Sequence, residues 1–173
     1  MERLDILGDT GAETYQINDL TSTELKVFNI DTGAAGSAET FAVEGRNVAD
    51  NVNVSSAGTR VTLSGLSYSL NIDNAAAADG DAFTFNANAG NDTVTTADDL
   101  SLFLTTANFI LHGGLGTGVS SGYGTLNGKD GDETWGGGRR WHVINRGHGY
   151  DTNPGRASSG GDGRAEGGRR RRR

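Results

Sequence analysis

Apolar residues alternate with small or polar residues in short stretches along the first 137 positions of the chain. The clearest stretches are Tyr15–Ile17, Phe41–Val43, Val52–Val54, Val61–Leu63, Leu70–Ile72, Phe83–Phe85 and Leu102–Leu104. A period of two places the apolar side chains on one face of a strand. We therefore predict an all-β fold with strands of three to five residues, and a helical turn is the alternative only at 97–105.

One turn recurs between these stretches. A cluster of Gly, Ala, Asn or Ser is followed by an acid, and an apolar residue stands two positions after the acid. The acids of this pattern are Glu13, Glu39, Asp50, Asp81 and Asp92, and Gly118 takes the sixth place. The six positions are separated by 26, 11, 31, 11 and 26 residues. Repeats of irregular length that share a turn predict coils stacked as a parallel β-solenoid or β-roll, with insertions in some rungs.

Charge divides the chain into two units. Residues 1–137 hold 19 acids and 5 bases, whereas residues 138–173 hold 3 acids and 10 bases. Of the large aliphatic and Phe residues, only Val143 and Ile144 lie in the second unit, which is too few for a core. We predict an acidic β-domain over 1–137 and a disordered, basic Gly/Arg-rich tail over 138–173.

The composition also excludes several kinds of functional site and of membrane or export segment. The chain has no Cys, which rules out disulfides, thiolate-bound zinc and a thiol nucleophile. No run of 18 apolar residues is present, so we expect no membrane span, and no apolar segment after Met1 indicates a cleavable signal.

The recurring turn resembles the Gly-Gly-x-Gly-x-Asp-x-apolar-x nonapeptide of RTX, or hemolysin-type, calcium-binding repeat proteins. Residues 8–16 and 87–95 come closest to it, the second through Gly90-Asn91-Asp92-Thr93-Val94, and the similarity covers about residues 5–118. The resemblance implies a secreted, non-catalytic domain that binds calcium and folds with it. It also implies neighbouring solenoid rungs of a larger protein as partners, and an extracellular location.

The same resemblance implies the calcium ligands. Ca²⁺ takes six to eight oxygen ligands, which carboxylates and the carbonyls of glycine-rich turns supply. Carried over by position, Asp92 is the principal ligand, with carbonyl oxygens of Asn88 and Gly90 beside it. The further candidates are Asp81, Asp50, Glu39 and Glu13, whereas Gly118 stands where the family has Asp. The alternative is a metal-independent β-solenoid with a structural or adhesion role, held by packing and by Asn and Thr hydrogen bonds.

The basic tail raises two further hypotheses. Residues 169–173 are all Arg, a pattern that can neutralise phosphates, but the acidic body would repel a polyanion, so we expect no nucleic-acid partner. Because glycine codons read in another frame can yield arginine, the residues after about 116 are also consistent with a displaced reading frame.

An enzyme is not expected. The chain has no Gly-Lys-Ser/Thr phosphate loop. His112, His142 and His148 lack the spacing of a zinc pair. The acid pairs at 98–99 and 130–132 are more typical of solvated loops than of acid–base catalysis.

Overall fold

The computed structural model describes residues 2–33, 36–96, 109–113, 119–127, 134–145, 148 and 165–166. The strands are β1 (Glu2–Leu7), β2 (Thr14–Ile17), β3 (Leu25–Asp31), β4 (Thr40–Glu44), β5 (Asn51–Ala57), β6 (Arg60–Ser64), β7 (Ser69–Asp73), β8 (Ala82–Asn86), β9 (Thr93–Thr96), β10 (Phe109–His112), β11 (Val119–Asn127), β12 (Thr134–Asn145) and β13 (Ala165–Glu166). A short 3₁₀ helix, η1 (Ala77–Asp79), precedes β8. In the part of the chain that is described, no helix reaches the length and apolarity needed to cross a membrane.

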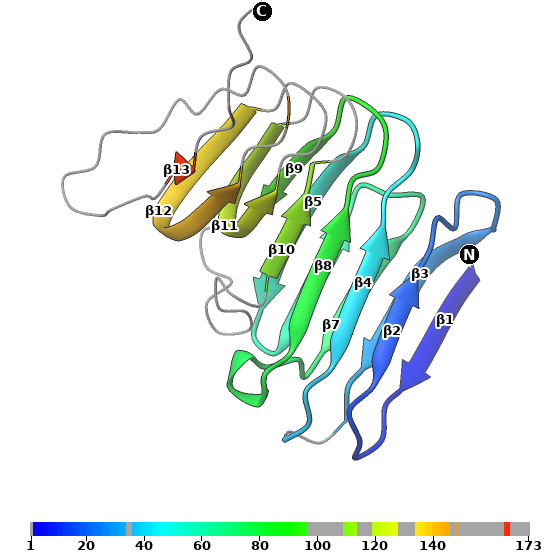
Figure 1. Ribbon diagram of the computed structural model, residues 1–173. Coiled ribbons are helices and arrows are strands. Elements are labelled where there is room, and N and C mark those ends of the chain that lie inside the picture. The colour runs from blue at the N-terminus through cyan, green and yellow to red at the C-terminus, as the bar shows by residue number, and fades with distance from the viewer. Residues whose placement is uncertain are drawn as a thin grey trace, which may run out of the picture.

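The strands form two series of neighbours, which we call arm A and arm B (Figure 1). Arm A contains β2, β4, β8 and β10, all parallel. Arm B runs from β1 through β3, β7, β6 and β5 to β9. The two arms meet at β11, whose residues 119–121 pair with β9 and whose residues 125–127 pair with β10. Successive strands of the chain therefore alternate between the arms, except in the segment β5–β6–β7.

That segment departs from parallel pairing. Strand β6 is antiparallel to both β5 and β7, while β7 pairs in parallel with β3, and β5 pairs in parallel with β9. The chain thus places three strands of arm B between β4 and β8. As a result, paired residues of β2 and β4 are 26 positions apart, as in Thr14 and Thr40, whereas paired residues of β4 and β8 are 42 apart, as in Thr40 and Ala82.

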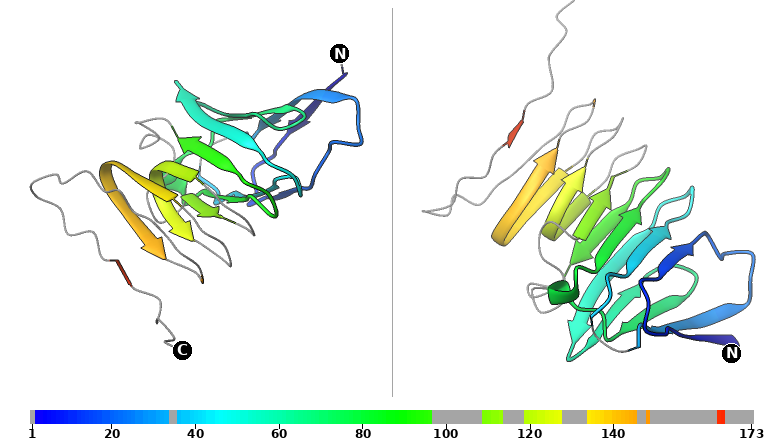
Figure 2. Two further views of the ribbon diagram at one scale, coloured as in Figure 1. Left: turned by 90° about the horizontal axis from the view of Figure 1, so that it is seen from above. Right: turned by 60° about the horizontal axis from the view of Figure 1, so that its bottom comes forward.

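A single apolar core lies between the two arms, which are seen as two layers in Figure 2. In β4 to β9 alternate residues point inward, as the buried Phe41 and Val43 of β4 and Val52 and Val54 of β5 illustrate. Because the strands of arm A are in register, like side chains stack, and the rings of Tyr15 and Phe41 lie parallel with centroids 5.0 Å apart. The core is therefore made of columns that run across the strands.

The prediction of an all-β fold is confirmed, and much of the sheet is parallel. Six of the seven expected stretches lie inside β2 and β4 to β8. The seventh, 102–104, and the alternative helical turn at 97–105 fall outside the described residues. Several strands exceed the expected five residues, since β3 and β5 each have seven. Strand β12 spans 134–145 and so crosses the position, 137, at which composition placed the end of the acidic domain.

Candidate functional site

The acids of the recurring turn lie in two columns, one on each arm. Because Thr14, Thr40 and Ala82 are paired across β2, β4 and β8, the residues just before them, Glu13, Glu39 and Asp81, follow one another across arm A. On arm B, Asn51 pairs with Thr93, which places Asp50 beside Asp92. Position 118 would extend the arm B column, because Val119 pairs with Thr93, but it lies outside the described residues. The sequence pattern had treated all six positions as one series.

Backbone hydrogen bonds join the acids of each column. The N–H of Thr40 donates to the carbonyl of Glu13, and the N–H of Ala82 donates to that of Glu39, both at 2.9 Å. On arm B the N–H of Thr93 donates to the carbonyl of Asp50 at 2.8 Å. The parallel pairing therefore continues through the turns themselves.

The side chain of Asp81 binds the backbone of the neighbouring turn. Its Oδ1 accepts a hydrogen bond from the N–H of Glu39, 42 residues earlier, at 2.9 Å. Its Oδ2 accepts one from the N–H of Ala76, in its own loop, at 2.7 Å. Asp81 is 1 % exposed, and an unpaired N–H at such depth would be costly. The carboxylate thus joins two turns by satisfying one buried donor in each.

Asp92 has the same relation to Asp50. The N–H of Asp50, again 42 residues earlier, donates to Asp92 Oδ1 at 2.9 Å. The second oxygen, Oδ2, is buried and has no hydrogen-bond partner within the described part of the chain. Burial raises the pKa of the Asp92 carboxyl, and the charge of Asp50 raises it further. The hydrogen bond from Asp50 and the charge of Arg46 act in the opposite direction.

Asp50 is contacted by Arg46, which sequence reasoning missed. The Arg46 N–H donates to Asp50 Oδ2 at 2.8 Å, and its Nε donates to Asp50 Oδ1 at 2.5 Å. The guanidinium also reaches the carbonyl of Ala49 at 3.3 Å. The signal in the sequence was an Arg four residues before the acid of a turn, in a region with few bases.

Asn88 and Gly90, two of the residues expected at a calcium site, pack against the turn that contains Arg46. Asn88, with φ of 65°, donates from Nδ2 to the carbonyl of Gly45 at 2.9 Å. Gly90 has φ of 147°, and a Cβ there would lie 2.7 Å from the carbonyl carbon of Val48. The structure therefore brings Asn88, Gly90 and Asp92 against the turn over 45–50, whereas Glu13, Glu39 and Asp81 lie on the other arm.

Glu39 is the most perturbed acid of the arm A column. It is 5 % exposed, and its pKa is raised from 4.5 to about 7. Burial is the main cause, followed by the hydrogen bond and the charge of Asp81 and then the charge of Glu13. Glu13 itself has one buried oxygen, Oε2, without a hydrogen-bond partner among the described residues. The Glu39 carboxyl is therefore partly protonated near neutral pH.

The two columns fit calcium to different degrees. Both oxygens of Asp50 accept hydrogen bonds from one arginine, whose charge opposes a cation at the same place. Asp92 and Glu13 each keep one oxygen free of hydrogen bonds, as a metal ligand requires. Within the described residues, no three His, Asp or Glu side chains are grouped closely enough to hold a metal ion. Asp92 is thus the residue of the expected set whose donor atoms fit best.

Polar side chains form a second kind of ladder, across β1, β3, β7 and β6 of arm B. Asn29 Nδ2 donates to Asp5 Oδ1 at 2.6 Å, and Asn71 Nδ2 donates to Asn29 Oδ1 at 2.8 Å. The hydroxyl of Thr62 then donates to Asn71 Oδ1 at 3.0 Å. These bonds join four successive strands through side chains that need no ion.

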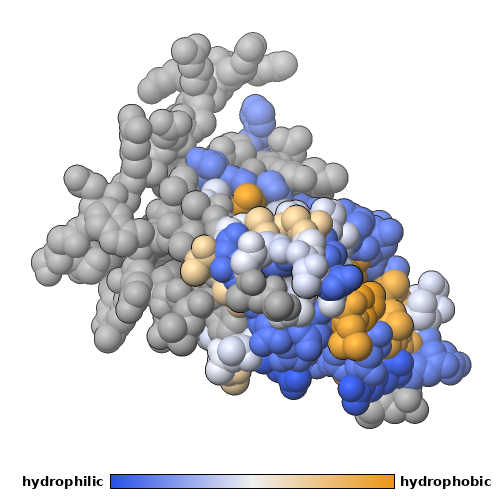
Figure 3. All heavy atoms as spheres, turned by 90° about the horizontal axis from the view of Figure 1, so that it is seen from below, coloured by the Kyte–Doolittle hydropathy of each residue, from blue (hydrophilic) through white to orange (hydrophobic). Residues whose placement is uncertain are grey.

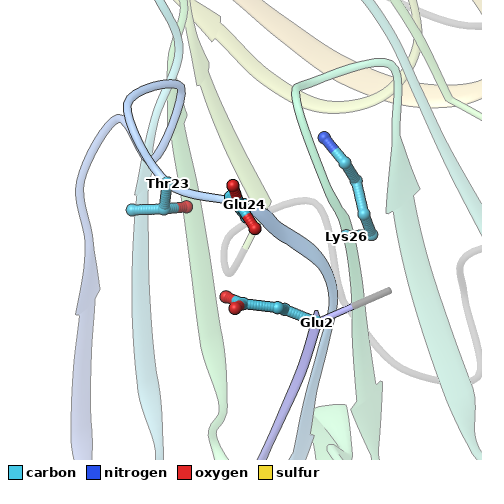
Figure 4. A pocket seen from close by; sticks show the side chains of 4 residues that line it. All are labelled: Glu2, Thr23, Glu24 and Lys26. Carbon is cyan, nitrogen blue, oxygen red and sulfur yellow. The ribbon is translucent and has the colours of Figure 1, made fainter.

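The surface outside the two columns shows one open pocket and a limited hydrophobic patch. An open pocket at the edge of arm B is lined by Glu2, Thr23, Glu24 and Lys26, where the two carboxylates point into the same space and Lys26 points away (Figure 4). Hydrophobic surface forms a limited patch on a mainly hydrophilic face (Figure 3). Among the residues that the structure describes, the exposed large apolar side chains are Leu4, Leu7 and Val48.

His112 and His148, which the sequence also singled out, do not join these columns. His112 ends β10, in register with Asn86 and Asn127, and His148 is exposed. His142 belongs to β12, while the acid pairs at 98–99 and 130–132 and the arginines at 169–173 lie outside the described residues. Comparisons with protein-family models, with curated proteins and with solved structures found no match to this chain.

Proposed function

We propose that this chain is a non-catalytic structural module, a β-solenoid whose rungs are held together by buried acids without a metal ion. The observation that carries the proposal is that the buried acids accept hydrogen bonds from the backbone of neighbouring turns. Asp81 and Asp92 each bind the backbone N–H of the acid in the neighbouring turn, at the same separation of 42 residues. A carboxylate that already satisfies a buried donor contributes to folding without calcium. The Asn and Thr ladder of arm B adds metal-free contacts between strands.

The decisive experiment is unfolding of the full chain with and without divalent ions. We expect urea unfolding, followed by far-ultraviolet circular dichroism, to give the same midpoint in EGTA, in 5 mM Mg²⁺ and in a few millimolar Ca²⁺, about the upper end of the range for extracellular calcium modules. A β spectrum in EGTA that persists to the same urea concentration supports the proposal. A chain that is unfolded in EGTA and gains strands only with Ca²⁺ would refute it.

A second candidate function, calcium binding at the turn of Asp92, is favoured by the free and buried Asp92 Oδ2. The segment 90–94, which resembles the repeat of hemolysin-type calcium-binding proteins, supports the same residue. An ion there would be bound weakly, with a dissociation constant of about 10⁻⁴–10⁻³ M, as in extracellular calcium modules. Because such weak binding suits the extracellular space, this second proposal includes secretion of the protein.

Calcium titration of two variants separates this candidate from the first. Asp92→Asn keeps an oxygen for the N–H of Asp50 but removes the charge, while Asp9→Asn removes an exposed acid as the control. If calcium binds at Asp92, calorimetry detects one site in the wild type and in Asp9→Asn but none in Asp92→Asn. Equal heats for all three proteins would place any binding elsewhere.

A further inference from the structure

Arg46 stands where the parallel stacking of arm B stops. Asp92 binds the N–H of Asp50, the acid of the next parallel strand. Asp50 has no such neighbour on its other side, because β6 runs antiparallel to β5. Its carboxylate is nonetheless 2 % exposed and needs donors. Arg46 supplies them to both oxygens, one from its backbone and one from its guanidinium.

The ion pair of Arg46 and Asp50 is more buried than the ion pairs Arg3–Asp5 and Arg60–Asp73. The pairs Arg3–Asp5 and Arg60–Asp73 have side chains that are between 25 % and 64 % exposed. In the pair Arg46–Asp50 the Asp side chain is fully buried and the Arg side chain is 28 % exposed. Removing one partner of a buried pair leaves an uncompensated charge, whereas exposed pairs contribute little.

The two acids of this column also act on each other. Asp50 and Asp92 belong to neighbouring turns joined by a hydrogen bond, and both are 2 % exposed. The charge of Asp50 raises the pKa of Asp92, and the charge of Arg46 lowers it. One guanidinium therefore acts on both carboxylates, through contact with Asp50 and through its charge at Asp92, and offsets one of the two negative charges. A cation bound between two carboxylates would offset their charge in the same way.

We propose that Arg46 is a built-in counter-ion, whose guanidinium takes the place of a bound cation between the turns of Asp50 and Asp92. The inference rests on the first proposed function, and it explains why the column of Asp50 and Asp92 needs no metal ion. It also predicts a latent requirement: without Arg46, the carboxylates of the two neighbouring turns have no counter-charge, and a divalent cation becomes a way to supply one.

The test compares Arg46→Met with Arg60→Met. Methionine keeps a long apolar side chain but loses the charge and the donors, and Arg60 is the matched arginine of an exposed pair. In EGTA we expect Arg46→Met to raise the unfolding equilibrium constant by about 100-fold, and Arg60→Met by less than about 5-fold. Millimolar Ca²⁺ should raise the urea midpoint of Arg46→Met and leave those of the wild type and Arg60→Met unchanged, with Mg²⁺ as the ion control.

Two further variants keep the result interpretable. If Arg46→Met does not fold in EGTA, the double variant Arg46→Met/Asp50→Asn should, because it removes the charge that lost its partner. Arg46→Lys should restore part of the stability through its ammonium. An Arg46→Met protein that behaves like Arg60→Met in both ions, beside a metal-independent wild type, overturns the role of Arg46. A wild type that itself unfolds in EGTA overturns the first proposed function instead.

Discussion

Protonation of Glu39 makes the stability of the domain depend on pH near neutrality. In the folded protein its pKa is about 7, mainly because the carboxyl is buried and also because Asp81 lies beside it. In the unfolded chain it returns to its ordinary value of 4.5. Between these values the folded state binds more protons than the unfolded state. The free energy of unfolding must therefore decrease as pH rises through this window.

The size of the effect follows from the two pKa values. The difference between 4.5 and about 7 corresponds to about 3 kcal/mol. This stabilisation is complete below the unfolded value and is lost once pH passes the folded value. We expect the free energy of unfolding to fall by about 1–3 kcal/mol from pH 5 to pH 8.

Urea unfolding at half-unit steps of pH measures this slope. Glu39→Gln mimics the protonated carboxyl and should flatten the profile between pH 5 and pH 8. Glu44→Gln is the control, because Glu44 accepts a hydrogen bond from Asn86, away from the column, and should keep the wild-type slope. A wild-type stability that is constant or increases from pH 5 to pH 8 would refute the reasoning. So would a Glu39→Gln profile parallel to that of the wild type.

Three substitutions test other parts of the account by chemical denaturation. Asp81→Ala leaves the N–H of Glu39 without its acceptor and should lower stability by about 1–3 kcal/mol; a loss below 0.5 kcal/mol would mean that water replaces the carboxylate. Gly90→Ala should destabilise by about 2 kcal/mol or more, because φ is 147° and the new Cβ meets Val48; an unchanged midpoint would mean that the turn moves freely. Tyr68→Phe removes a buried hydroxyl that has no partner among the described residues and should be neutral or stabilising, and a loss above 1 kcal/mol would reveal a hidden partner.

The strands could be predicted from sequence because their signal is local. In Phe41–Val43 and Phe83–Phe85 the alternation of apolar and small residues is also the alternation of buried and half-buried side chains. Stacking of the turns was expected from their shared pattern, but the pairing of β4 with β8 was not. The antiparallel β6 was not expected either, since Val61–Leu63 alternates in the same way as the parallel strands. Direction within a sheet is set by the connections, which alternation does not encode.

The division of the acids into two columns could not be predicted from the sequence, for a related reason. The spacing of 11 residues that separates Glu39 from Asp50, and Asp81 from Asp92, carries the chain from one arm to the other. The spacing of 42 that joins true neighbours appears only when the three strands β5, β6 and β7 are known to lie on one arm. The role of Arg46 was missed because its contact with Asp50 depends on how the turn folds. A single Arg four residues before an acid does not by itself indicate such a contact.

Stacked acids pose the same electrostatic problem at every rung. Neighbouring strands lie about 4.8 Å apart, and at an effective dielectric constant of 20 two carboxylates at that distance repel by about 3.5 kcal/mol. This repulsion exceeds the roughly 1.5–3 kcal/mol that a charged hydrogen bond contributes, so the backbone contacts of Asp81 or Asp92 cannot sustain a fully ionised column. The arm B column has a guanidinium to offset one of its two charges, whereas Glu39 of the arm A column, with a pKa of about 7, is partly protonated near neutral pH. Arm A should thus respond to pH, and arm B to the loss of one arginine.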